Sequence, residues 1–150
     1  MNRDVLSLRA AAAEASAAGG HARAAEHLEQ AVELAPAGIA RGEIQLELAH
    51  AQAGAGAGRY GHAAESAAEA RRSFTESGDV RRAAQAMIVE ARYRWHARET
   101  GVALELAREA IATLATLGES EDLAEAHAEL SRQLAWPTEA KKPHVGASRR

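Results

Sequence analysis

Residues 19–36 read GGHARAAEHLEQAVELAP, and the interpretation of the whole chain depends on this stretch. Ala24, Leu28 and Ala31 recur at the spacing that places side chains on one face of a helix. Two glycines precede this apolar stripe and Pro36 follows it, which are the stop signals expected on either side of a helix. The stretch therefore predicts one amphipathic helix between two turns.

Comparable helical patterns fill most of the 150 residues, and the class predicted from them is all-α. Apolar residues make up 47 % of the chain and aromatic residues only 3 %, with alanine the commonest apolar type. No long stretch alternates apolar with polar residues as a half-buried strand would. Asp4 is the expected N-cap of the first helix and Ser120 that of the last. The expected helices cover residues 4–18, 21–35, 39–53, 61–77, 79–98, 102–117 and 120–136.

A pair of alanines seven residues apart in the opening stretch recurs twice further along the chain. The recurring pairs are Ala24 with Ala31, Ala63 with Ala70, and Ala103 with Ala110, and the intervals between them are 39 and 40 residues. Small residues at these places allow paired helices to touch, and glycines fall between the helices. A period of this length is typical of a helical solenoid, in which each hairpin of helices packs against the next.

The spacing of Ala24, Ala31 and Pro36 resembles the tetratricopeptide repeat (TPR) family. In that family a small residue stands early in the second helix of each unit, an alanine follows seven positions later, and a proline comes soon after. Gly19 fits the turn of the unit and Leu8 its large first-helix position. The stretch GRYGHAAESAAEA fits the turn and second helix of the next unit. The period of about 40 residues exceeds the usual 34 of the family, so the resemblance is to a divergent member.

The resemblance implies a right-handed α-solenoid of about three helix-turn-helix pairs, followed by a C-terminal capping helix. This TPR-like domain is expected to cover residues 1–136. Residues 137–150 form a basic tail with too little apolar content to fold, and we expect it to be disordered. Lysine occurs only at Lys141 and Lys142 while arginine is abundant, a composition that suggests a bacterial source.

The net charge of −3 conceals blocks of opposite sign along the chain. Residues 71–98 carry seven arginines against three acidic side chains, whereas the segments 1–70 and 99–136 on either side are both acidic. Five of the seven arginines lie in the expected fifth helix, which is the most distinctive feature beyond the repeat. The acidic flanks and the scarcity of aromatic residues argue against nucleic acid as the partner.

In the TPR family the first helix of each pair lines a concave groove, where some members hold an acidic peptide end with basic side chains. The resemblance implies that Gln85, Arg92 and His96 point into such a groove and that Arg82 lies near its rim. Guanidinium groups suit carboxylates because they donate paired hydrogen bonds. The alternative is that these arginines only solvate the helix, or pair with Glu90 and with neighbouring acidic helices. Trp95 lies on the apolar side of the same helix and is expected in the core.

The sequence carries no recognisable catalytic, metal or cofactor motif, and we expect a protein that is not an enzyme. Cysteine is absent, which excludes disulfides and a thiol nucleophile. Glu47 and His50 have the spacing that helical di-iron proteins use, but those sites need a second copy of the motif. The run GAGAG at 54–58 follows a helix and lacks the lysine of a phosphate loop, so it is interpreted as a turn.

These observations predict a scaffold for protein–protein interaction that binds a peptide or protein segment, with an acidic segment as one expectation. One alternative is a ligand-sensing or regulatory subunit that acts with a separate transcription or signalling protein. Another is self-association through the end helices, where Leu6, Leu8, Leu123, Leu130 and Leu134 are apolar. Residues 1–20 lack the apolar core of a signal peptide, and no run of about 20 apolar residues occurs. We therefore expect a cytoplasmic protein without membrane contact.

Overall fold

The computed structural model describes residues 2–135, and within them the chain is helical, as predicted. The short 3-10 turn Ala57–Arg59 lies in the glycine-rich segment between the third and fourth helices. The predicted tail, residues 137–150, and the last residue of the predicted domain lie outside the described residues. The α-helices are α1 (Arg3–Ala17), α2 (His21–Leu34), α3 (Ile39–Gly54), α4 (Tyr60–Glu76), α5 (Val80–His96), α6 (Thr100–Ala115) and α7 (Glu121–Ala135).

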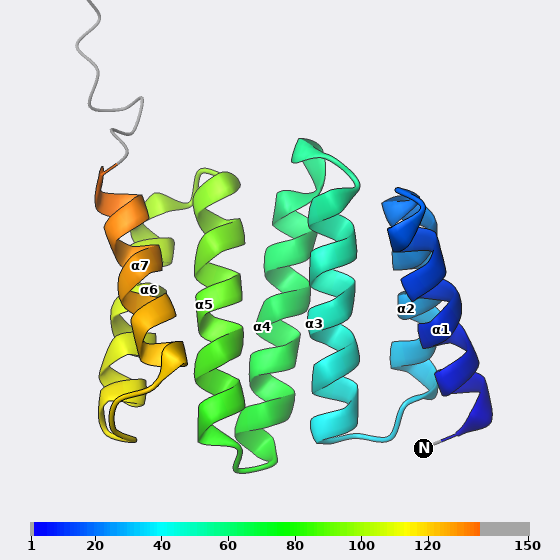
Figure 1. Ribbon diagram of the computed structural model, residues 1–150, viewed down its shortest axis with the longest axis horizontal. Helices are drawn as coiled ribbons and strands as arrows, with labels where there is room; N and C mark the ends of the chain where they lie inside the picture. The colour runs from blue at the N-terminus through cyan, green and yellow to red at the C-terminus, as the bar shows by residue number, and fades with distance from the viewer. Residues whose placement is uncertain (1, 136–150) are drawn as a thin grey trace, which may run out of the picture.

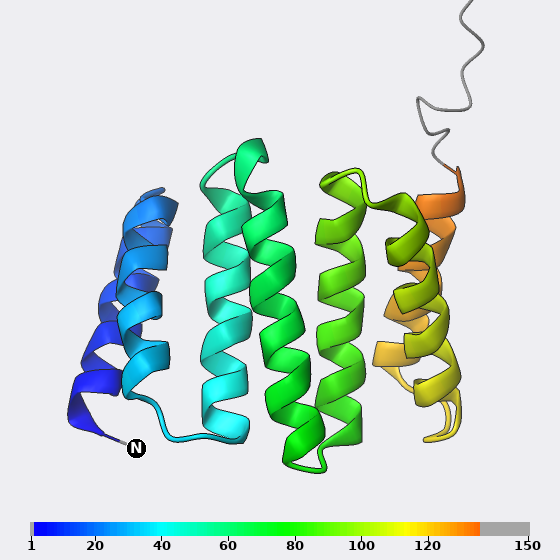
Figure 2. The ribbon, with the colours of Figure 1, turned by 180° about the vertical axis from the view of Figure 1, so that it is seen from behind.

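Successive helices pack against one another in a single row from α1 to α7 (Figure 1). The odd-numbered helices stand toward the viewer in Figure 1, and the even-numbered helices stand toward the viewer from behind in Figure 2. The last helix packs against both α6 and α5. The fold is therefore three helical hairpins side by side with α7 closing the row, which confirms the all-α class and the packing of successive helices.

The recurring alanines occupy equivalent buried places. Ala24, Ala63 and Ala103 stand near the start of α2, α4 and α6, and none of the three exposes any surface. Their partners seven residues later, Ala31, Ala70 and Ala110, are also fully buried. Because a methyl group takes little room, each even-numbered helix approaches its neighbours closely along this stripe. The alanines that recur in the sequence are therefore buried at matching positions of α2, α4 and α6.

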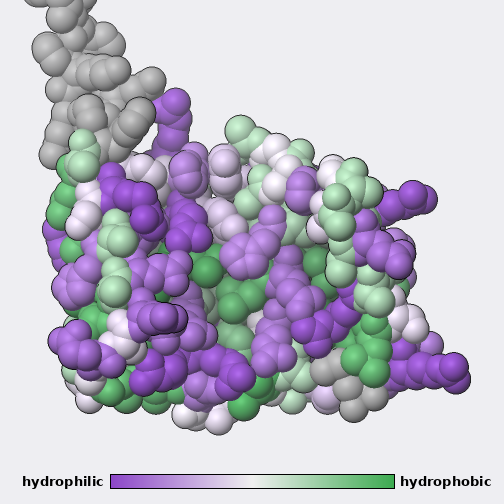
Figure 3. Space-filling view, viewed as in Figure 1, coloured by the Kyte–Doolittle hydropathy of each residue, from purple (hydrophilic) through white to green (hydrophobic). Residues whose placement is uncertain are grey.

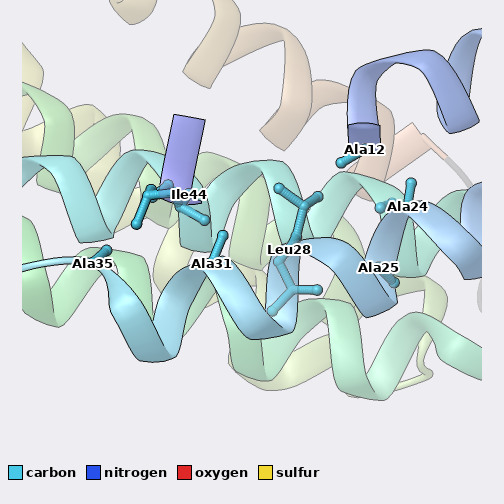
Figure 4. Close-up of a cluster of buried hydrophobic side chains, with 10 residues drawn as sticks. Ala12, Ala24, Ala25, Leu28, Ala31, Ala35 and Ile44 are labelled. Carbon is cyan, nitrogen blue, oxygen red and sulfur yellow. The ribbon is translucent and has the colours of Figure 1, made fainter. Parts of the chain in front are cut away.

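Larger side chains fill the space between these close contacts. Leu28 of α2 and Ile44 of α3 form one buried cluster with the alanines of α2 (Figure 4). Phe74 of α4 is fully buried, and its ring lies against Gly42 of α3. Because glycine has no side chain, the ring can approach the backbone of α3 directly. The core is thus built from few large residues, each placed beside small ones.

Two polar links join α3 to α4 inside the core. Ser73 Oγ donates to Gln45 Oε1 at 2.7 Å, and Ser66 Oγ donates to Gln52 Oε1 at 2.6 Å. The glutamines are seven residues apart on α3 and the serines seven apart on α4, in opposite order along two antiparallel helices. Since the four side chains are largely enclosed, the links fix the register of this helix pair as well as satisfying its polar groups.

Of the two predicted N-caps, that of α7 is confirmed and that of α1 is wrong. Ser120 Oγ accepts from the backbone N–H of Leu123 at 3.2 Å, as expected for the start of α7. At the start of α1 the prediction was wrong, because Asn2 and not Asp4 is the N-cap. The Asn2 Oδ1 accepts from the backbone N–H of Asp4 at 2.9 Å. Asp4 lies inside the first turn, where its negative carboxylate interacts favourably with the positive end of the helix dipole.

Candidate functional site

The odd-numbered helices form the face on which the predicted binding residues lie, and we call it the groove face. Figure 3 shows this face hollowed at its centre, with apolar surface in the hollow and polar side chains around it. Two cavities are lined largely by side chains of these helices. One of about 390 Å³ lies among α1, α2 and α3, and one of about 590 Å³ lies between α5 and α7.

Ion pairs join each odd-numbered helix to the next across the groove face, and we call this set the charge ladder. The first pair is Arg9 of α1 with Glu47 of α3, where the Arg9 Nε donates at 3.2 Å. The basic member of each pair comes from α1 or α5 and the acidic member from α3 or α7. The charge that each odd-numbered helix contributes to these pairs therefore alternates in sign along the row. The remaining pairs are Glu43–Arg82 (3.5 Å), Arg81–Asp122 (3.2 Å), Arg92–Glu125 (3.1 Å) and Arg92–Glu129 (3.2 Å).

Arg82 and Gln85, two of the predicted binding residues, both take part in these contacts. Arg82 bonds Asp79 at 2.7 Å, within its own helix turn, and reaches Glu43 of α3 at 3.5 Å. Gln85 Nε2 donates to Asp122 Oδ1 of α7 at 3.1 Å. The two residues therefore point to opposite neighbours of α5, Arg82 toward α3 and Gln85 toward α7.

Among the predicted binding residues, Arg92 has the most buried ion-pair partner, Glu129 of α7. Its Nε donates to Glu129 and its Nη2 to Glu125, both on α7. Burial opposes the charge of Arg92, but the attraction of Glu129 and hydrogen bonds to both carboxylates outweigh it and raise the Arg92 pKa. The guanidinium is therefore held by the molecule's own carboxylates, which is the alternative considered from the sequence.

His96 lies in a group of rings that the sequence did not predict. Its ring stacks on Tyr60 with centroids 4.7 Å apart, and Tyr60 stacks on Tyr93 at 6.1 Å. The Tyr93 hydroxyl and His50 Nδ1 share a hydrogen bond of 2.7 Å. Tyr60 of α4 and Tyr93 of α5, the two tyrosines of the chain, thus pack together with buried alanines of α3 and α4. His50, Tyr60 and Tyr93 are too far apart in sequence for local spacing to place them together.

Trp95 was expected in the core but is only partly buried, because it lines the cavity between α5 and α7. The acidic partners of α5 were also missed as individual residues. The available signal was the alternation of charged blocks, which indicated that the basic fifth helix had acidic neighbours without showing which carboxylates meet which arginines.

No protein-family model matches the chain, and no curated protein matches it. Within residues 2–135 no three side chains of metal-binding type gather as a metal site would require. Over the same residues no helix has the length and apolar character needed to cross a membrane.

Proposed function

We propose that this protein is an interaction scaffold of the TPR-like type, a right-handed solenoid that binds a peptide or protein segment along its groove face. The hollow on this face is the observation that supports the proposal. Two cavities are lined largely by the odd-numbered helices, and the floor of the hollow exposes apolar surface between hydrophilic side chains (Figure 3). An extended segment lying in the hollow covers apolar surface while its polar groups meet the walls.

The charges of the groove face favour a segment that carries both signs. Arg82 and Arg92 already have carboxylate partners, so an acidic side chain of the segment must displace one of them. Glu43 and Glu125 are the easiest to displace, because both are partly exposed and such ion pairs stabilise by only about 0–1 kcal/mol. A displaced carboxylate then needs a cation, which a basic residue of the segment supplies.

Affinity capture with matched variants tests this proposal. The groove variant is R92A/H96A, and the control is R108A/H62A, which removes an arginine and a histidine exposed on the even-numbered helices α6 and α4. Partners captured by the wild type and the control variant should be lost with the groove variant. Undiminished capture by the groove variant would remove the groove face from the binding surface.

Self-association through the ends of the row is a second candidate. Leu6 on α1 is 54 % exposed and Leu134 on α7 is 59 % exposed, the two highest values among the exposed large apolar side chains of the described residues. Both helices stand at an end of the row, where no further helix packs against their outer side. Light scattering over a wide concentration range tests this candidate, and a strict monomer at all concentrations counts against it.

A further inference from the structure

The cavity between α5 and α7 is built differently from the open hollow beside it. Its volume is about 590 Å³, within the range of small-ligand sites. The wall from α5 consists of Arg92, Trp95 and His96, and the wall from α7 includes Glu129, Arg132 and Gln133. It therefore combines two guanidinium groups, one carboxylate and an indole.

Hydrogen bonds to the single carboxylate leave the cavity wall with an excess of donors. Glu129 accepts from Arg92 Nε at 3.2 Å, from Arg132 Nη2 at 2.6 Å and from Gln133 Nε2 at 3.0 Å. Three donors thus share one buried group. The Arg132 side chain is 58 % exposed, and its other N–H groups have no further partner among the described residues.

Two further groups of the wall lack partners. Gln133 is 2 % exposed, and its Oε1 has no hydrogen-bond donor, which is costly for an enclosed acceptor. Trp95 is partly buried, and among residues 2–135 its indole N–H has no acceptor. The indole gives the cavity a flat apolar surface next to the cationic groups, and unpaired polar groups next to both.

We propose that this cavity binds a small organic anion with a flat apolar body, an aromatic carboxylate in the simplest case. The guanidinium of Arg132, together with Arg92, receives the carboxylate through charge-assisted hydrogen bonds. The ring packs against Trp95, as aromatic pairs do. The inference goes beyond the proposed function and does not depend on it, since it uses the lining of this cavity alone.

Glu125 competes with such a ligand for Arg92. Its carboxylate bonds Arg92 Nη2 at 3.1 Å, yet its side chain is 52 % exposed and it does not line the cavity. An incoming carboxylate replaces it at little cost, because exposed ion pairs are weak. Removing the charge of Glu125 should therefore tighten ligand binding, an effect opposite to that of removing Arg132.

Titration of the full chain, labelled with ¹⁵N, tests the inference with 2-naphthoate as the probe. The neutral 2-naphthamide is the matched control ligand, since it has the same ring without the charge. Resonances of the Trp95 indole and the Gln133 side-chain amide should shift with 2-naphthoate, and the amide should bind at least tenfold more weakly. Equal affinity for the two ligands, shifts spread over other helices, or no binding at millimolar probe would overturn the inference.

Three variants locate the site and its charge preference. R132Q should lower the affinity for 2-naphthoate at least fivefold, and E125Q should raise this affinity severalfold. R108Q on α6 should leave the affinity unchanged. Arg132 and Glu125 are exposed, so both variants should keep the helical circular dichroism of the wild type.

A peptide that ends in an aromatic residue presents the same chemistry, and binding by the peptide but not by free 2-naphthoate would overturn the assignment to a small ligand. Loss of protein capture by R92A/H96A is a separate result that leaves this test intact.

Discussion

Gly42 of α3 lies directly against the ring of Phe74 on α4. A Cβ atom at Gly42 would stand 2.6 Å from Phe74 Cε1 and 2.9 Å from Cδ1 and Cζ. Phe74 is fully buried, so its ring has little room to move. We expect G42A to lower the free energy of unfolding by about 1–3 kcal/mol through overpacking, a loss that the helix preference of alanine offsets by at most about 1 kcal/mol. Chemical denaturation measures the difference.

Gly101 of α6 provides the control for this substitution. A Cβ atom added there meets no atom within 4 Å, and the residue has ordinary helical backbone angles. G101A should therefore be neutral or stabilise the protein by a few tenths of a kcal/mol, up to about 1. If G42A were as stable as G101A, the close contact with Phe74 would not constrain the α3–α4 packing.

His50 should titrate below the ordinary range of a histidine. Burial lowers its pKa, the nearby Arg92 lowers it further, and Glu125 and Glu47 raise it by less. The unfolded chain therefore takes up a proton at this residue first, and the fold loses stability as the pH falls from about 6.5 through the lower folded value. NMR titration of the His50 ring should give a midpoint below 6.5. R92Q should move it upward without restoring the ordinary value, and an unchanged midpoint in R92Q would rule out the contribution of Arg92.

At the scale of elements, the antiparallel pair α3 and α4 depends on its two buried polar links. Removing Ser66 leaves the Gln52 amide oxygen enclosed without a donor. We expect S66A to cost about 1–3 kcal/mol, the usual range for an orphaned buried group. The double variant Q52L/S66A removes both partners and should recover most of this loss. Thermal or chemical unfolding of the wild type, S66A, Q52L and the double variant distinguishes a true link from two independent side chains, whose effects would simply add.

The junction of α5 and α7 should weaken in acid. Burial disfavours the Glu129 carboxylate, but hydrogen bonds from Arg132 and Gln133 and the charge of Arg92 outweigh burial and lower its pKa. Its contribution is therefore present above the unfolded pKa of about 4.3 and is lost as the pH falls through the lower folded value. Denaturation at pH 7, 5 and 3.5 should show this loss. E129Q should be less stable at pH 7 and should depend less on pH, whereas E121Q, on the exposed first turn of α7, should behave as the wild type.

At the scale of the whole molecule, the sequence predicted the order of helices and their repeat, because both depend on local spacing. The alanines at equivalent places were correct for this reason. The cap of α1 was wrong because Asn2 and Asp4 are both good cap residues. The choice between them depends on backbone angles that composition does not reveal.

The candidate site was less predictable than the fold. The placement of Arg82, Gln85, Arg92 and His96 on one helix was readable from the sequence, but their partners were not. The partner carboxylates come from α3 and α7, and pairing them requires the distance and rotation between whole helices. Trp95 shows the same limit, since an apolar position on a helix face is buried only where a neighbour covers it, and a cavity separates α5 from α7 at that point.

The charge ladder gives the molecule an electrostatic period twice as long as its structural one. Hairpins recur about every 40 residues, whereas a helix of the same sign returns on the groove face only after two hairpins. Duplicating the single hairpin α3–α4 would set glutamate against glutamate, while duplicating α3 to α6 together would keep opposite charges adjacent. We therefore expect gene duplications that add an even number of hairpins to be tolerated, and those that add an odd number to destabilise the protein.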